Sequence, residues 1–150
     1  MNTYRIAFVG HGRGDEGSAL EKRIDKIIKN ILQTKPHTVF YVGWSGTFDL
    51  WVTERVKKVR EALGSKNGCI VMIPHRPITY YAFYKLVYDE ILYPIEWDGT
   101  SEDSIAKRDQ WMVDHADLLV SYAESDCDGG VSETLQYARR KGVEIINLAM

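Results

Sequence analysis

Short runs of apolar residues alternate with amphipathic segments along the whole chain. Each run is five or six residues long and rich in Val, Ile, Leu or aromatic side chains, which is typical of strands in a buried sheet. The runs lie at residues 4–9, 38–42, 69–73, 118–123 and 144–148. The run at 69–73 is wholly apolar, so we expect a strand that is covered on both faces.

Between these runs, apolar residues recur at steps of three and four, which predicts helices with one buried face. The pattern is formed by Leu20, Ile24, Ile27, Ile28 and Ile31, by Val52, Val56, Val59 and Leu63, and by Val131, Leu135 and Ala138. A further helix is predicted from residue 101 to about residue 115, because hydroxyl and acidic residues open it. The alternation favours an α/β, Rossmann-like fold, in which a five-stranded, mainly parallel sheet carries helices on both faces.

Three strand-to-helix turns contain glycine: one begins at Gly10, one holds Gly43 and Gly46, and one ends in Gly129 and Gly130. Glycine lets the backbone approach a ligand closely, and the free N–H groups at a helix start attract anions, most often phosphate. Because parallel strands end at one edge of a sheet, these turns are expected to converge on one ligand. An ordinary tight turn explains the glycine pair equally well, so both interpretations stay open.

Polar residues beside these turns are candidates for ligand contact. His11 and Arg13 follow the first strand, where they can bind a ligand or, for His11, cap the turn. After the second strand, Ser45 offers a hydroxyl, and Asp49 either caps the next helix or accepts a hydrogen bond from a ribose hydroxyl. Trp44 could stack on a base, but packing is the commoner role of an aromatic residue near a turn.

Residues 78–97 are rich in aromatic side chains, and Tyr80, Tyr84 and Tyr88 stand at helical spacing. Aromatic residues concentrate in cores and at the centres of subunit interfaces. We therefore expect core or interface packing here, in preference to a platform for base stacking.

The amino-acid composition and net charge limit the binding partners and the cellular location that we expect. A chain of 150 residues with 45% hydrophobic content is long enough for a single domain, residues 1–150, with its own core. The net charge of −2 gives no electrostatic reason to bind nucleic acid or a membrane, so neither partner is expected. The two cysteines make no disulfide framework, and neither a membrane-spanning segment nor a signal-peptide pattern is found, which favours the cytoplasm. The four histidines lack metal-ligand spacing, so no metal is expected, and no cofactor is indicated.

Several short motifs follow one another along the chain. They are Gly10-His11, Gly43-x-x-Gly46 with Asp49-Leu50-Trp51, Ile73-Pro74, Arg108-x-x-x-Met112 with Asp117, and Gly129-Gly130-x-x-x-Thr134-x-x-Tyr137-Ala138. Together they resemble the motifs of the SLOG superfamily, which groups the DNA-processing protein DprA with the cytokinin-activating LOG proteins. Within it, the chain looks most similar to the YpsA-like branch. The resemblance spans most of the chain and implies a Rossmann-like fold that binds a nucleotide or a nucleotide-derived ligand.

In LOG proteins, an arginine and a glutamate cleave the N-glycosidic bond between a base and ribose 5′-monophosphate. The resemblance assigns the arginine to Arg108 and makes Glu133 the candidate glutamate. The LOG pattern places paired acids five and six residues after its second glycine, where this chain has Leu135 and Gln136. Because a carboxylate stabilises the oxocarbenium-like charge that develops on the sugar, this departure weakens the case for catalysis. Glu133 can instead serve the helix dipole.

Two functions compete. The first, which we favour, is a module that binds or senses a nucleotide or another ribose-phosphate ligand. The second is a LOG-like hydrolase of a nucleoside 5′-monophosphate, with Arg108 and Glu133 as catalytic residues. A third, structural possibility is a scaffold whose aromatic segment forms a homodimer, and a homo-oligomer is expected in any case. The expected ligand-binding residues are Gly10, His11, Arg13, Gly43, Ser45, Gly46, Asp49, Gly129, Gly130, Ser132 and Thr134.

Overall fold

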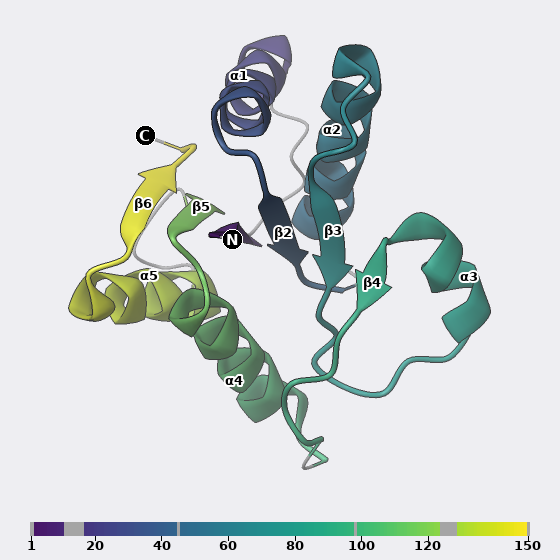
Figure 1. The fold of residues 1–150 in the computed structure, drawn as a ribbon. Helices are drawn as coiled ribbons and strands as arrows, with labels where there is room; N and C mark the ends of the chain where they lie inside the picture. Colours follow the sequence, from purple (N-terminus) through teal and green to yellow (C-terminus); the bar gives the residue numbers. More distant parts are fainter. Residues whose placement is uncertain (1, 11–16, 45, 98, 124–128, 150) are drawn as a thin grey trace.

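The computed structural model describes residues 2–10, 17–44, 46–97, 99–123 and 129–149. These residues form a six-stranded sheet with the order β4-β3-β2-β1-β5-β6, and all neighbouring strands are parallel (Figure 1). The strands are β1 (Tyr4–Gly10), β2 (Thr38–Val42), β3 (Cys69–Met72), β4 (Glu90–Ile91), β5 (Leu118–Tyr122) and β6 (Glu144–Asn147). The α/β fold with a parallel sheet, expected from the sequence, is therefore confirmed.

The sheet has one strand more than the sequence predicted. In β4, Glu90 pairs with Val71 and Ile91 with Met72 of the neighbouring β3. Two residues are too few to show the alternation or the apolar run that signals a strand. They also follow an aromatic stretch whose spacing indicated a helix. The other strand boundaries lie within one residue of those expected.

Within the described ranges, the connections between strands contain five helices. They are α1 (Ser18–Thr34), α2 (Thr47–Leu63), α3 (Tyr81–Val87), α4 (Ser101–Asp114) and α5 (Gly129–Lys141). Helices α1 and α2 cover one face of the sheet and α4 and α5 the other, while α3 lies beyond the edge strand β4 (Figure 1). None of these described helices is long and apolar enough to cross a bilayer.

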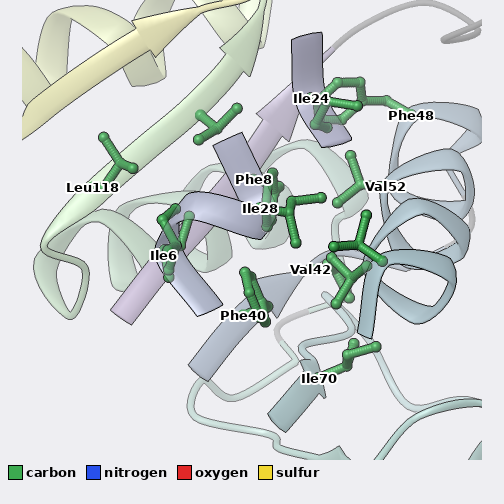
Figure 2. Packing of buried hydrophobic residues seen from close by; sticks show 14 of the residues in the cluster. Ile6, Phe8, Ile24, Ile28, Phe40, Val42, Phe48, Val52, Ile70 and Leu118 are labelled. Atoms are coloured by element: carbon green, nitrogen blue, oxygen red, sulfur yellow. The ribbon is translucent and has the colours of Figure 1, made fainter. Parts of the chain in front are cut away.

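Apolar side chains fill both interfaces between the helices and the sheet. On one face, Ile24 and Ile28 of α1 and Val52 of α2 are buried against the strands (Figure 2). They meet Phe8 and Phe40, whose rings stack with their centroids 5.9 Å apart. Alternate residues of the strands point to the opposite face. The core on that face includes Ala7, Val9, Val71, Met112, Leu119, Leu135 and Ala138.

The strand order changes direction at β1. From β1 the chain proceeds through β2 and β3 to β4, and it then crosses back to β5 on the other side of β1. Open α/β sheets bind ligands beyond the C-terminal ends of their strands at such a reversal. The fold therefore brings the C-terminal ends of β1, β2 and β5 to the edge at which a ligand is expected.

The aromatic stretch lies mostly on the surface. Tyr88 is buried, whereas Tyr80, Tyr81 and Phe83 have exposed fractions of 78%, 49% and 60%. A core position is therefore wrong for these three residues, while a position between subunits stays a prediction. Tyr80 also precedes α3 with φ of 57°, a left-handed backbone conformation that bulky residues rarely adopt.

The end of β1 gives a test of packing between the sheet and α2. A Cβ atom at Gly10 would lie 2.7 Å from ring atoms of Phe48, which is buried and cannot move without disturbing the core. We expect Gly10→Ala to lower the free energy of unfolding by about 1–3 kcal/mol, measured by urea denaturation. The control is Gly130→Ala in the first turn of α5, because a Cβ there meets no atom within 4 Å in the part of the chain that the structure describes. Equal stabilities of the two variants would contradict this packing.

Candidate functional site

A cavity of about 290 Å³ opens at the C-terminal edge of the sheet. Among the described residues, its walls come from the end of β1, the turns after β2 and β3, the first turn of α2, α4 and the first turn of α5. Six of the residues proposed from the sequence line it: Gly10, Gly43, Gly46, Asp49, Arg108 and Gly130. The structure thus brings together the glycine turns that the sequence expected to converge.

Three of the other expected residues, His11, Arg13 and Ser45, fall outside the described residues. Gly129 begins α5. Ser132 is half-buried in the first turn of that helix and does not line the cavity.

Glu133 and Thr134 line a neighbouring groove of about 570 Å³ between α4 and α5. Glu133 is exposed, and the structure places it in this groove and not in the cavity at the strand ends. Asp109 and Gly130 line both spaces, so the groove and the cavity adjoin.

Arg108 brings a buried positive charge to the cavity. Its side chain comes from α4 and is almost fully buried. Its Nε donates to Oδ1 of Asp109 at 2.8 Å, and its Nη1 donates to the carbonyl oxygen of Ile73 at 3.1 Å. These contacts use two of the five N–H groups of the guanidinium and fix its plane.

Asp49 closes the turn between β2 and α2. Its carboxylate accepts hydrogen bonds from the backbone N–H groups of Gly43 and Gly46, which satisfies donors at the helix start. Burial raises the pKa of Asp49 to about 6, although Arg108 and the two backbone donors act in the opposite direction. Asp49 is therefore not the N-cap of α2, because Gly46 holds that position. From the third residue of the helix, its side chain bonds back to the backbone N–H of Gly46.

Asp109 is a site residue that the sequence reasoning missed. Its carboxylate is buried, and burial raises its pKa, while the charge of Arg108 and hydrogen bonds from Arg108 and Thr134 oppose this shift. An acidic residue directly after the candidate arginine was the available signal. On a helix, however, neighbouring residues usually point in different directions, so the signal was weak.

His75 and Trp44 form the wall beyond β2 and β3. Their ring centroids are 5.6 Å apart, and both residues line the cavity. Burial lowers the pKa of His75 to about 4, with further lowering by Arg108 and Arg76, so the imidazole is neutral at pH 7. His75 was not proposed from the sequence, although its place just after a central strand put it at the ligand edge.

The glycines of the cavity differ in what surrounds them. A Cβ at Gly43 would lie 2.8 Å from Oδ2 of Asp49 and 2.9 Å from Nη1 of Arg108. A Cβ at Gly46 would also lie 2.8 Å from Oδ2 of Asp49. At Gly130, in contrast, no atom of the described residues lies within 4 Å of that position. Gly43 and Gly46 therefore make room for the protein's own side chains, whereas Gly130 leaves room for a ligand.

Comparisons with known proteins find the same fold. No protein-family model and no curated protein matches the chain. A structure of DNA processing protein A from Helicobacter pylori, described for its single-stranded DNA binding mode, matches with a TM-score of 0.65 and 12% identity. The match covers 95% of this chain but only 63% of that protein, so the chain spans less than two thirds of its length.

Two structures of the molybdenum cofactor carrier protein from Chlamydomonas reinhardtii also match. Their TM-scores are 0.60 and 0.57, at 11% and 12% identity, over 96% and 99% of this chain and 75% and 77% of those proteins. Identities this low show a shared fold. The comparisons show the fold alone, so the SLOG superfamily stays a prediction. The YpsA-like branch stays a prediction.

One expectation needs correction. The net charge of −2 was taken to exclude a nucleic-acid partner. A protein with this fold binds single-stranded DNA, so that expectation is wrong. Net charge reports the sum over the whole surface, whereas nucleic acid is bound by a local arrangement of positive and aromatic groups.

The shifted pKa values of His75 and Asp49 affect the pH dependence of stability in opposite directions. The pKa of His75 is lowered from 6.5 to about 4, so its neutral form stabilises the fold above pH 6.5, and this contribution is lost as the pH falls to 4. The pKa of Asp49 is raised from 3.8 to about 6, so its protonated form favours the fold at low pH, and stability falls as the pH rises through this range. When the pH falls from 6.5 to 4.5, we expect the free energy of unfolding of His75→Gln to rise by about 1–2 kcal/mol relative to that of wild type. Over the same range, we expect that of Asp49→Asn to fall by about 1–2 kcal/mol relative to wild type.

Urea denaturation of the three proteins at both pH values measures this difference. Because each variant is compared with wild type, the other titrating groups cancel. A wild-type pH dependence in both variants would contradict the placement of these two groups.

Proposed function

We propose that the chain is a binding module for a nucleotide-derived ligand that carries a ribose phosphate. The observation that supports this best is the cavity in which the start of α5, free of side-chain atoms at Gly130, faces the same space as the buried guanidinium of Arg108. The fold is shared with proteins named for single-stranded DNA binding and for carrying a cofactor, so ligand binding is a common use of it. Residues 1–150 would form a single domain of this kind.

The start of α5 suits a phosphate. The helix has 13 residues, and no acidic residue occupies its first turn. Its first N–H groups have no partner within the helix, and the positive end of the helix dipole lies there. Gly130 allows the backbone to come within hydrogen-bond distance of the phosphate oxygens.

The charges around Arg108 tune its attraction for an anion. Asp49 and Asp109 offset part of the positive charge, and burial raises the pKa of both carboxyl groups. An anion that enters the cavity raises these pKa values further, so protonation relieves the repulsion. The volume of about 290 Å³ lies at the lower limit for ligand pockets, which suits a ribose phosphate or a mononucleotide better than a dinucleotide.

The alternative function is hydrolysis of the N-glycosidic bond of a nucleoside 5′-monophosphate. Buried carboxyl groups with raised pKa values favour it, because such groups act as general acids or stabilise positive charge on the sugar. In the cavity these groups are Asp49 and Asp109, whereas Glu133 faces the adjoining groove. A hydrolase would therefore use Asp109, beside Arg108, more readily than Glu133.

Binding is tested with ribose 5-phosphate and AMP by calorimetry. We expect Arg108→Ala to weaken both by about 1.5–3 kcal/mol, the scale of a hydrogen bond to a charged group. Arg108→Lys keeps the charge, so its affinity for each ligand should lie between those of wild type and the alanine variant. The matched control is Arg140→Ala, because Arg140 is exposed and lines the groove between α4 and α5. Affinities that are unchanged in folded Arg108→Ala would reject this role.

Hydrolysis is tested by chromatography of free base after incubation with a panel of nucleoside monophosphates. If wild type releases base, we expect Asp109→Asn to abolish release and Glu133→Gln to retain it. The reverse pattern would assign the chemistry to Glu133. Absence of release across the panel would leave the binding module as the function.

A further inference from the structure

Two nitrogen atoms in the cavity wall are buried without a hydrogen-bond partner among the described residues. They are Nε1 of Trp44 and Nδ1 of His75. His75 has an exposed fraction of only 8%, and both residues line the cavity. Buried polar atoms are nearly always paired, because an unpaired one loses its hydrogen bonds to water without replacement. Both atoms belong to residues that line one cavity, so a polar ligand bound there is a candidate for the partner that they lack.

The indole of Trp44 is held in place by three neighbouring side chains. Tyr84 packs against it edge-on at 6.5 Å between ring centroids, and the guanidinium of Arg76 lies 5.3 Å from its centre. His75 contacts the same ring at an interplanar angle of 43°. Because three neighbours fix the ring, its N–H points in a constant direction. A fixed N–H favours a role in recognising a ligand.

The two unpaired nitrogen atoms, Trp44 Nε1 and His75 Nδ1, need different hydrogen-bond partners. Trp44 Nε1 can only donate a hydrogen bond, so its partner must be an acceptor. The imidazole of His75 is neutral at pH 7, so Nδ1 accepts or donates according to its tautomer. A ligand that presents an acceptor next to a second polar atom can bond both nitrogen atoms. The edge of a nucleobase has this pattern of polar atoms.

The strand order places this wall opposite the start of α5. Trp44 and His75 follow β2 and β3, while Gly130 stands beyond β5, on the other side of β1. A ligand whose phosphate binds at Gly130 therefore directs its other end toward Trp44 and His75. In a mononucleotide, that end is the base.

We propose that Trp44 and His75 recognise the edge of a heterocyclic base, and that the ligand is a nucleoside monophosphate with its base intact. This inference rests on the proposed function and adds the residues that determine specificity. Trp44 Nε1 donates to a ring or carbonyl acceptor of the base, and His75 Nδ1 bonds the adjacent atom. Ribose 5-phosphate alone leaves both nitrogens unpaired.

The test compares ribose 5-phosphate with AMP, GMP, CMP and UMP by calorimetry. For wild type we expect the best monophosphate to bind about tenfold or more tightly than ribose 5-phosphate. Trp44→Phe keeps an aromatic ring but removes the N–H, so it should weaken that monophosphate about five- to tenfold and leave ribose 5-phosphate within about twofold. The control is Trp111→Phe on α4, which does not line the cavity in the described structure and should change neither affinity.

A second pair of variants tests His75. Asn places a polar atom near the position of Nδ1 and Gln near that of Nε2, so His75→Asn should keep more of the preference for the monophosphate than His75→Gln. Melting temperatures establish that each variant is folded. Equal binding of the monophosphates and ribose 5-phosphate by wild type, or an equal loss for both in Trp44→Phe, would overturn the proposal. Failure of wild type to bind either ligand would instead refute the proposed function, and the base site with it.

Discussion

A guanidinium buried at the ends of the strands is the constraint on which the rest of the site depends. Arg108 has an exposed fraction of only 8%, and a charge held away from water is very unfavourable unless other groups pair with it. Its partners come from different parts of the fold: Asp109 on α4, the carbonyl of Ile73 after β3, and Asp49 on α2 through its charge. The buried charge therefore fixes how α4, β3 and α2 approach one another.

The glycines around this charge follow from the same constraint. Gly43 has no side chain because Arg108 and Asp49 occupy the space that a Cβ would need, and Gly10 makes room for the ring of Phe48. The start of α5 is different, since no described residue occupies the space next to Gly130. Glycine turns on one sheet edge thus serve two purposes, and the surrounding atoms distinguish them: some allow the protein to pack, and one allows a ligand to approach.

The sequence predicted much of this fold because its signals were long or repeated. Apolar runs and helical periodicity predicted five of the six strands and the helices α1, α2 and α5, since each element shows several residues of its pattern. Helix α4 was predicted from the hydroxyl and acidic residues that open it. The two-residue β4 left no such pattern. In the aromatic stretch, spacing at four residues does not reveal which side chains the fold covers. A core position was therefore right for Tyr88 and wrong for the exposed Tyr80 and Phe83, while an interface position stays a prediction.

Only part of the site was predictable from the sequence, because local motifs are visible in it and contacts between distant residues are not. Glycine after a strand and an arginine in a motif are local signals, and they identified Gly43, Gly130 and Arg108 correctly as neighbours of one space. Trp44 and His75 are 31 positions apart in the sequence and meet only because β2 and β3 are adjacent in the sheet. The direction of Glu133 depends on how α5 rotates against α4, which the spacing of its apolar residues does not fix to within one side chain.

A crystal structure of the protein with AMP tests the central claim most directly, because it locates each part of the ligand. The account predicts electron density in the cavity, with the phosphate on the first N–H groups of α5 near Gly130 and the base against Trp44 and His75. AMP bound in the groove between α4 and α5, beside Glu133 and Arg140, with the cavity at the strand ends left unfilled, would contradict it.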